Sequence, residues 1–190
     1  MATINPTEEG TIDFTYQGET YQTWYKVYGD IKNSSRTPLV VLHGGPGMSH
    51  DYLIPMSDLT PLANIPTIFY DQVGNARSTH IKDKPKTFWS AEIFVEELEN
   101  LLKHFGISES FDLYGHSWGG ILATEFEVRK QPAGLRKTGA FQHSRSVLAL
   151  ERVNETVGAN FPCRYSRSLG KWYGRSRAIS SCIGKVPRRV

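Results

Sequence analysis

The chain has 190 residues, of which 39% are hydrophobic and 12% aromatic, so it is long enough to form one globular domain with a buried core. It contains no run of 18 apolar residues that would predict a membrane span, and "MATINPTEEG" lacks the basic and apolar regions of a signal peptide. These patterns predict a cytoplasmic protein without a membrane partner. Cys163 and Cys182 are too few to predict a disulfide framework or a metal site.

Charge divides the chain into two parts. Residues 1–136 hold 17 acidic and 11 basic side chains, whereas residues 137–190 hold 11 basic but only 2 acidic ones. The second part is also rich in Arg, Ser and Gly and has no clean helical or strand periodicity. We therefore expect residues 1–136 to belong to a folded domain and residues 137–190 to be an irregular basic tail, disordered or translated out of frame.

The first predicted elements are strands. "TIDFTYQGETYQTWYKVYGD" (11–30) alternates polar with aromatic or branched residues around a turn at 17–19, which predicts a hairpin ending near Gly29. "LVVLHGGPG" (39–47) and "IPTIFYDQVG" (65–74) each hold a continuous apolar run followed by a turn. Such runs predict strands that are buried on both faces of a sheet.

Two helices and a further strand are predicted after these. Residues 90–107 carry apolar residues at helical spacing, with Ser90 as candidate N-cap and Gly106 at the end. "SFDLYGHS" (110–117) predicts an apolar strand, and the helix that follows it stops at Pro132. Strands that alternate with helices after a hairpin predict an α/β fold with parallel strands.

Ser117 lies between two glycines in "LYGHSWGG" (113–120), directly after the apolar strand and before a helix. Gly-x-Ser-x-Gly in this position is typical of a nucleophile elbow, which lifts the serine hydroxyl above the sheet. The helix N-terminus then offers backbone N–H groups to a developing oxyanion. We predict Ser117 as the nucleophile and the N–H of Trp118 as one oxyanion donor; the alternative is that Ser117 only caps the helix.

A glycine turn, "HGGPG" (43–47), ends an earlier strand. Its glycines allow backbone angles closed to other residues and expose N–H groups, so the turn predicts the second oxyanion donor, from Gly44 or Gly45. We interpret His43 as a residue that orients this turn by hydrogen bonding and not as the catalytic base.

The third motif is "DQVGNARS" (71–78), in which Asp71 and Arg77 can pair and brace the loop, unless it is an ordinary surface turn. In this order, HGGPG, DQ-x-G-x-x-R-S and G-x-S-W-G-G resemble the α/β-hydrolase family of prolyl aminopeptidases, or proline iminopeptidases. The resemblance covers roughly residues 10–136. One departure is Ala76, which stands where the family motif usually has glycine.

The resemblance implies the N-terminal half of an α/β-hydrolase sheet and a serine aminopeptidase without metal or cofactor. It would release N-terminal residues, proline foremost, from small peptides or amino-acid amides by acyl transfer through Ser117. Gly45 and Trp118 would be the oxyanion donors. The rest of the glycine turn would lie near the substrate's N-terminal end: His43, Gly44, Pro46 and Gly47.

The groups that would activate Ser117 are not evident. In this fold the chain order is Ser, then Asp or Glu, then His, but after residue 136 the one histidine, His143, precedes both acids. We therefore expect the catalytic Asp and His to be missing, which suggests a frame shift, a retained intron or a wrongly assigned gene end. The strand before Ser117 would then be an unpaired apolar edge, and the chain would fold poorly.

Three alternatives stay open. The chain is an inactive truncated product or a binding remnant, or it is an esterase or amidase of the same fold. The basic tail also suits a nucleic acid or anionic lipid, but out-of-frame translation gives the same composition, so no nucleic-acid partner is predicted.

Overall fold

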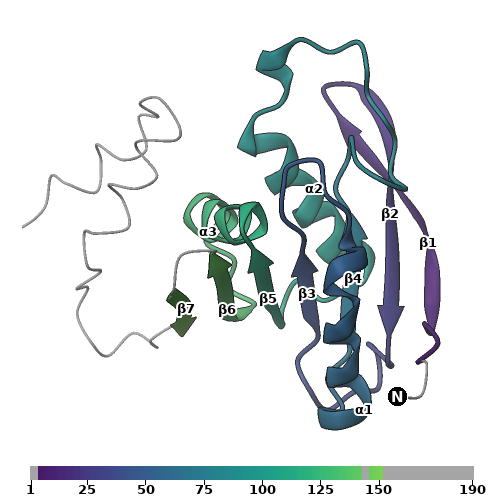
Figure 1. Cartoon of the computed structure of the whole chain (residues 1–190), viewed down its shortest axis with the longest axis vertical. Helices are drawn as coiled ribbons and strands as arrows, with labels where there is room; N and C mark the ends of the chain where they lie inside the picture. The colour runs from purple at the N-terminus through teal and green to yellow at the C-terminus, as the bar shows by residue number, and fades with distance from the viewer. Residues whose placement is uncertain (1–3, 143–145, 152–190) are drawn as a thin grey trace, which may run out of the picture. The chain divides into compact units, whose positions relative to one another are not determined.

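Seven strands form one sheet within residues 4–142 and 146–151, the part of the chain that the computed structural model describes (Figure 1). Their order across the sheet is β1-β2-β4-β3-β5-β6-β7. The elements in chain order are β1 (Glu8–Tyr16), β2 (Glu19–Tyr28), β3 (Leu39–Leu42), the 3₁₀ helix η1 (His50–Asp58), α1 (Leu59–Ala63), β4 (Thr67–Asp71), the 3₁₀ turn η2 (Lys86–Phe88), α2 (Ala91–His104), β5 (Phe111–His116), α3 (Trp118–Lys130), β6 (Leu135–Gln142) and β7 (Ser146–Glu151).

The predicted hairpin is confirmed as β1 and β2. The pairing of Tyr16 with Glu19 leaves a two-residue loop, in which Gln17 has φ 50° and Gly18 has φ 82°. Two central residues with positive φ are the mark of a type I′ turn, whose twist matches that of the strands. The turn signal in the sequence therefore set the register of this hairpin.

The parallel centre of the sheet brings three turns to one edge. β3 pairs in parallel with β4 and with β5, and β5 pairs in parallel with β6. Because parallel strands run in one direction, the segments after β3, β4 and β5 leave the sheet from the same edge. These segments begin at His43, Gln72 and Ser117, so the three sequence motifs converge.

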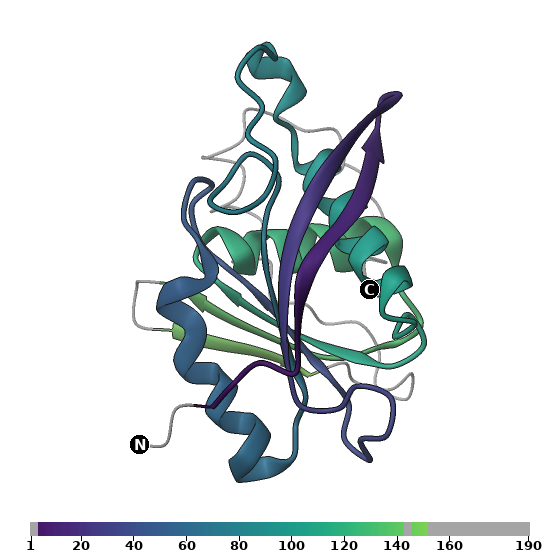
Figure 2. The ribbon, with the colours of Figure 1, turned by 90° about the vertical axis from the view of Figure 1, so that its right-hand side faces the viewer.

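Alternation along the strands sends side chains to two opposite sides of the sheet. Val40 and Leu42 of β3 join the core cluster of α2 and α3, whereas Val41 packs with Phe69 of β4 and Leu53 of η1. Figure 2 shows the η1–α1 segment on one side of the strands and α2 and α3 on the other. The short apolar strands are buried on both faces, as the sequence predicts.

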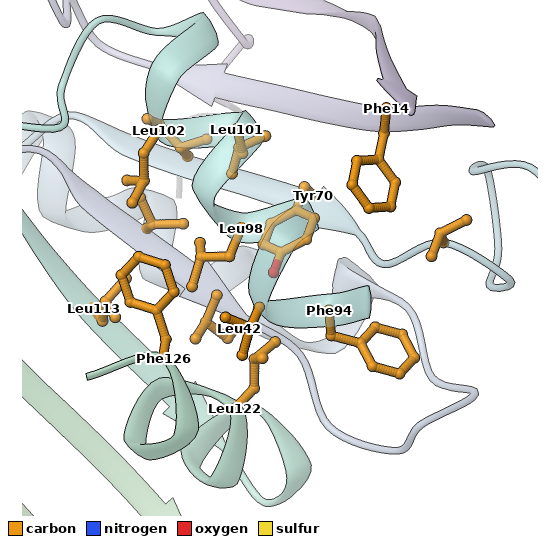
Figure 3. Close-up of a cluster of buried hydrophobic side chains, with 14 of the residues drawn as sticks. Phe14, Leu42, Tyr70, Phe94, Leu98, Leu101, Leu102, Leu113, Leu122 and Phe126 are labelled. Carbon is orange, nitrogen blue, oxygen red and sulfur yellow. The ribbon is translucent and has the colours of Figure 1, made fainter. Parts of the chain in front are cut away.

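Helix α2 forms as predicted and supplies much of the larger core. Figure 3 shows Leu98 and Leu101 of α2 with Tyr70 of β4 and Phe126 of α3, and all four are fully buried. Ser90 stands at the N-cap with extended backbone, but its side chain makes no capping hydrogen bond. The helix is therefore held mainly by its apolar face, because packing contributes more to helix stability than one cap.

The end of the sheet differs from the prediction. Strand β6 crosses the boundary expected at 136/137 and pairs with β5 from Phe111 to His116, so β5 is not an unpaired edge. Strand β7 then pairs with β6, and both belong to the compact unit Met1–Arg152. The small residues Gly139 and Ala140 hide the strand pattern in the sequence. The rest of the expected tail, residues 152–190, and His143 lie outside the described residues.

The segment between β3 and β4 contains two short helical elements that the sequence pattern does not predict. It folds into η1, which contains Pro55, and α1, which ends at Asn64 in the left-handed conformation. Among the helices of the described residues, none is both long and apolar enough to span a bilayer.

Candidate active site

Ser117 occupies the sharp turn between β5 and α3. Its backbone has φ 53° and ψ −114°, which lies outside the regions that L-residues favour. The side chain is half-buried and makes no capping hydrogen bond, although Ser117 stands at the N-cap of α3. A strained turn with the hydroxyl not used as a cap is the geometry that a nucleophile elbow requires.

The glycines on either side of Ser117 are required by close backbone contact. A Cβ atom on Gly115 would lie 2.3 Å from the backbone of Gly119, and one on Gly119 would lie 2.1 Å from the carbonyl oxygen of Leu42. Neither separation is sterically possible, so any side chain would push α3 away from β3 and β5. The Gly-x-Ser-x-Gly spacing thus follows from how closely the helix approaches the sheet.

The glycine turn lies beside the elbow. A Cβ atom on Gly44 would lie 3.2 Å from the carbonyl oxygen of His116, the residue before the serine. Gly44 is buried and its N–H donates to the hydroxyl of Tyr52 at 2.7 Å. Gly45 is exposed, with φ 131°, and so are Pro46 and Gly47. Because the Gly44 amide is already occupied, Gly45 stays the candidate for the second oxyanion donor.

His43 is buried and uses both ring nitrogens within the protein. Nδ1 lies 2.8 Å from the carbonyl oxygen of Gly44, and Nε2 accepts the backbone N–H of Gln72 at 2.9 Å. This pattern assigns the proton to Nδ1 of a neutral ring. Burial lowers the pKa of His43, which also favours the neutral form. The ring fastens the turn to the segment after β4 and has no nitrogen left to act as a base.

Gln72 links the three motifs in one buried network. Its side-chain nitrogen donates to the carbonyl oxygen of His43 at 3.2 Å, and its side-chain oxygen accepts the indole N–H of Trp118 at 2.8 Å. All three residues are buried, and the bonds connect the segments after β3, β4 and β5. The turn and the elbow, which carry the candidate oxyanion donors, are therefore held relative to each other by Gln72.

Asp71 braces the segment from 71 to 78, as the sequence predicts. The guanidinium of Arg77 lies 3.4 Å from the Asp71 carboxylate, and it lies closer, 3.0 Å, to Asp51. Asp71 also accepts the backbone N–H of His50 at 2.9 Å and its Nδ1 at 2.8 Å. Burial raises the pKa of Asp71, but the interactions with His50 and the backbone N–H of Arg77 together outweigh it and hold the pKa below the ordinary value.

The distance between His50 and Asp71 is that of the base and carboxylate in a catalytic triad, but the surroundings of the pair are different. The His50 ring is buried and stacks against Trp24 with centroids 4.5 Å apart. Its Nε2 lies 3.6 Å from the carboxylate of Asp51, the next residue of η1. We therefore interpret this pair as a brace for η1, because a buried ring cannot reach a substrate.

A second buried carboxyl, Glu97 of α2, lies under the loop that follows β4. It accepts the Thr23 hydroxyl at 2.6 Å and the backbone N–H of Val73 at 2.8 Å. Burial raises the pKa of Glu97 to about 8. At neutral pH this side chain is mainly protonated, and it joins α2 to β2 and to the loop.

The described residues after Ser117 contain neither a histidine nor an aspartate. His143, the one histidine after residue 136, lies outside the described residues. No group of three or more His, Cys, Asp or Glu side chains in the part of the chain that the structure describes is arranged to hold a metal ion. The site as described therefore consists of a nucleophile turn and a glycine turn.

A mixed sheet with a parallel centre, flanked by helices and carrying a serine in a strained strand-to-helix turn, defines an α/β hydrolase. The family model of the alpha/beta hydrolase fold matches residues 37–131, which is half of the chain. The chain belongs to this family.

Within the family, the chain is similar to proline iminopeptidases. It is 40% identical to proline iminopeptidase of Lactiplantibacillus plantarum over 116 residues, which are 61% of this chain and 39% of that protein. The crystal structure of VinJ matches with 45% identity and a TM-score of 0.66, covering 72% of this chain and 44% of VinJ. The crystal structure of proline iminopeptidase from Mycobacterium smegmatis matches with 37% identity and a TM-score of 0.60. That match covers 68% of this chain and 42% of the other chain.

The chain spans about two fifths of the length of the curated relatives it matches. The part that the family model matches, residues 37–131, holds all three motifs, because they lie between residues 43 and 120.

Sequence reasoning missed Tyr52, His50 and Glu97. The first two lie shortly after the glycine turn in the sequence. A histidine and an aromatic residue so close to this turn could have marked them as candidate site residues. Glu97 gave none, because a glutamate on a helix is most simply read as solvent-exposed.

Proposed function

We propose that this chain carries the nucleophile half of a serine hydrolase of the proline iminopeptidase type. The strained backbone of Ser117 beside the glycine turn is the observation that supports the proposal most directly. The names of the similar proteins support the substrate class, a small peptide or amino-acid amide with a free N-terminal residue, proline foremost.

In the proposed reaction the Ser117 oxygen attacks the carbonyl carbon of the N-terminal residue and gives its proton to a general base. The carbonyl oxygen becomes an oxyanion, which accepts hydrogen bonds from the N–H groups of Gly45 and Trp118. The amide bond then breaks, the amine leaves with the proton, and the acyl group stays on Ser117. Water hydrolyses this ester and restores the serine.

The general base and its carboxylate stay unassigned. In α/β hydrolases they follow the serine in chain order, and the described residues after Ser117 contain neither a histidine nor an aspartate. A serine hydroxyl without a base is a weak nucleophile. The experiment must therefore measure whether this chain hydrolyses a substrate. The cytoplasmic location also stays a prediction.

The test is fluorophosphonate labelling of the full chain together with hydrolysis of a proline arylamide. We expect labelling and turnover that Ser117→Ala abolishes and that Ser108→Ala, a serine outside the site, leaves unchanged. Turnover that survives Ser117→Ala would overturn the proposal. Ester hydrolysis without arylamide hydrolysis would favour an esterase, and neither labelling nor turnover would favour the inactive alternative.

A further inference from the structure

We infer that Tyr52 is a positioning residue of the oxyanion hole, which occupies the Gly44 amide and leaves Gly45 to face the substrate. The inference rests on the function proposed above. It concerns a residue of η1 that lies outside the three sequence motifs.

The Tyr52 hydroxyl bridges the glycine turn and the elbow. Its oxygen accepts the Gly44 N–H at 2.7 Å and lies 2.8 Å from Nδ1 of His116. The Tyr52 and His116 rings also meet edge to face, with centroids 5.2 Å apart. One phenol oxygen thus contacts the segment after β3 and the residue directly before Ser117.

The count of protons and lone pairs fixes the direction of the bond to Gly44. A phenol has one proton and two lone pairs, and Gly44 supplies an N–H that can only donate. The Tyr52 oxygen therefore accepts from Gly44, whereas the direction of its bond with Nδ1 of His116 follows the tautomer of that ring. Both contacts are satisfied at once, so the hydroxyl holds the turn at a fixed separation from the elbow.

The exposure of the Tyr52 side chain indicates that its role is not to pack the core. Tyr52 is 38% exposed, so its ring is not needed to fill the interior. Gly44 must be glycine for the bridge to exist, because a Cβ atom there would lie 2.9 Å from the Tyr52 oxygen and 3.2 Å from Nδ1 of His116. Gly45 directly follows Gly44, which Tyr52 contacts, and Trp118 lies two residues after His116, which Tyr52 also contacts. Together with Gln72, the Tyr52 hydroxyl therefore sets the relative position of these two candidate donors.

The experiment compares Tyr52→Phe with Tyr25→Phe in the full chain. Tyr25→Phe also removes one tyrosine hydrogen bond, to Glu8 at 2.5 Å, but its ring packs on Phe105 at the C-terminal end of α2. Two quantities are measured: the hydrogen-exchange rate of the ¹⁵N-labelled Gly44 amide, and the rate of fluorophosphonate labelling of Ser117. The first does not require an active enzyme.

For Tyr52→Phe we expect Gly44 exchange to accelerate about tenfold or more, because the amide loses its acceptor. Labelling should slow about tenfold, less than the ~10²–10³-fold loss on removal of a whole oxyanion donor. Tyr25→Phe should change neither rate.

The outcomes separate the two proposals. If the unmodified chain is labelled and Tyr52→Phe is labelled equally fast, the positioning role is overturned and the proposed function stands. If the unmodified chain is not labelled, the proposed function fails, and the exchange rate decides whether Tyr52 holds Gly44. Equal Gly44 exchange in both chains would overturn the Tyr52 inference in either case.

Discussion

Ala76 holds a backbone conformation that glycine adopts without steric cost. Its φ is 44°, in the loop that follows β4, at the position where the motif usually has glycine. An L-residue with this φ brings its Cβ close to the backbone, at a cost of about 1–2 kcal/mol. The loop tolerates the strain because Asp71 accepts the Arg77 N–H at 3.2 Å and Ser78 donates to the Asp71 carbonyl oxygen.

We therefore expect Ala76→Gly to raise the free energy of unfolding by about 1 kcal/mol. Relief of the backbone strain stabilises the fold, and the greater conformational entropy of glycine in the unfolded chain offsets part of that gain. Urea unfolding of both chains measures it. Ala91→Gly, in the first turn of α2, serves as the control and should lower the same quantity. A decrease for Ala76→Gly would show that this loop does not store the strain.

At the scale of elements, the sequence predicted those whose pattern is strong and local. Helix α2 repeats its apolar residues at helical spacing, and β3 and β4 are unbroken apolar runs, so each is visible in a short window. Strand β6 is not visible in this way, because its sequence "LRKTGAFQ" mixes charged and small residues. Its small residues are explained only by their neighbours: a Cβ on Gly120 would lie 3.1 Å from the Cβ of Ala140.

Glu97 joins three elements in a way that makes stability depend on pH. In the unfolded chain this carboxyl has a pKa near 4.5, whereas burial raises it to about 8 in the fold. Between these values the unfolded state has lost the proton that the folded state keeps. The folded state binds more protons in this window, so the free energy of unfolding falls as pH rises from about 4.5 to about 8.

Glu97→Gln removes this ionisation while keeping an acceptor for Thr23 and Val73. We expect unfolding free energies, measured in urea at several pH values from 5 to 8, to fall less steeply with pH in the variant than in the unmodified chain. Glu96→Gln, at the neighbouring and partly exposed position, should leave the slope nearly unchanged. Parallel curves for Glu97→Gln and the unmodified chain would contradict the buried, protonated assignment.

At the scale of the whole molecule, the sequence predicted where the site lies but not what holds it together. The parallel order of β3, β4 and β5 follows from the alternation of strands and helices, so the convergence of three motifs was predictable. The bonds of Gln72 to His43 and Trp118 join residues 29 and 46 positions apart. No local pattern encodes such pairs, because they depend on how the strands align.

The pairing of β5 with β6 reverses the expectation that this chain folds poorly. Strand β6 is hydrogen-bonded on both sides, to β5 and to β7, and Thr138 at its centre is buried opposite Leu113. The strand that leads to Ser117 is thereby an interior strand, and its apolar edge is covered. A soluble chain with a cooperative thermal transition is now the expected result.

Thr138→Pro tests whether β6 is what protects the sheet. Proline removes an N–H from an interior strand and clashes with its neighbour, so we expect β5 to be exposed and the chain to aggregate. Thr138→Val keeps the branched shape and loses only a 3.4 Å hydrogen bond to Glu127, so it should stay soluble with a small drop in melting temperature. Size-exclusion chromatography and thermal melts distinguish the two variants. A soluble Thr138→Pro chain that melts like the unmodified one would mean that the sheet is complete without β6, and that the elbow strand does not depend on the residues after α3.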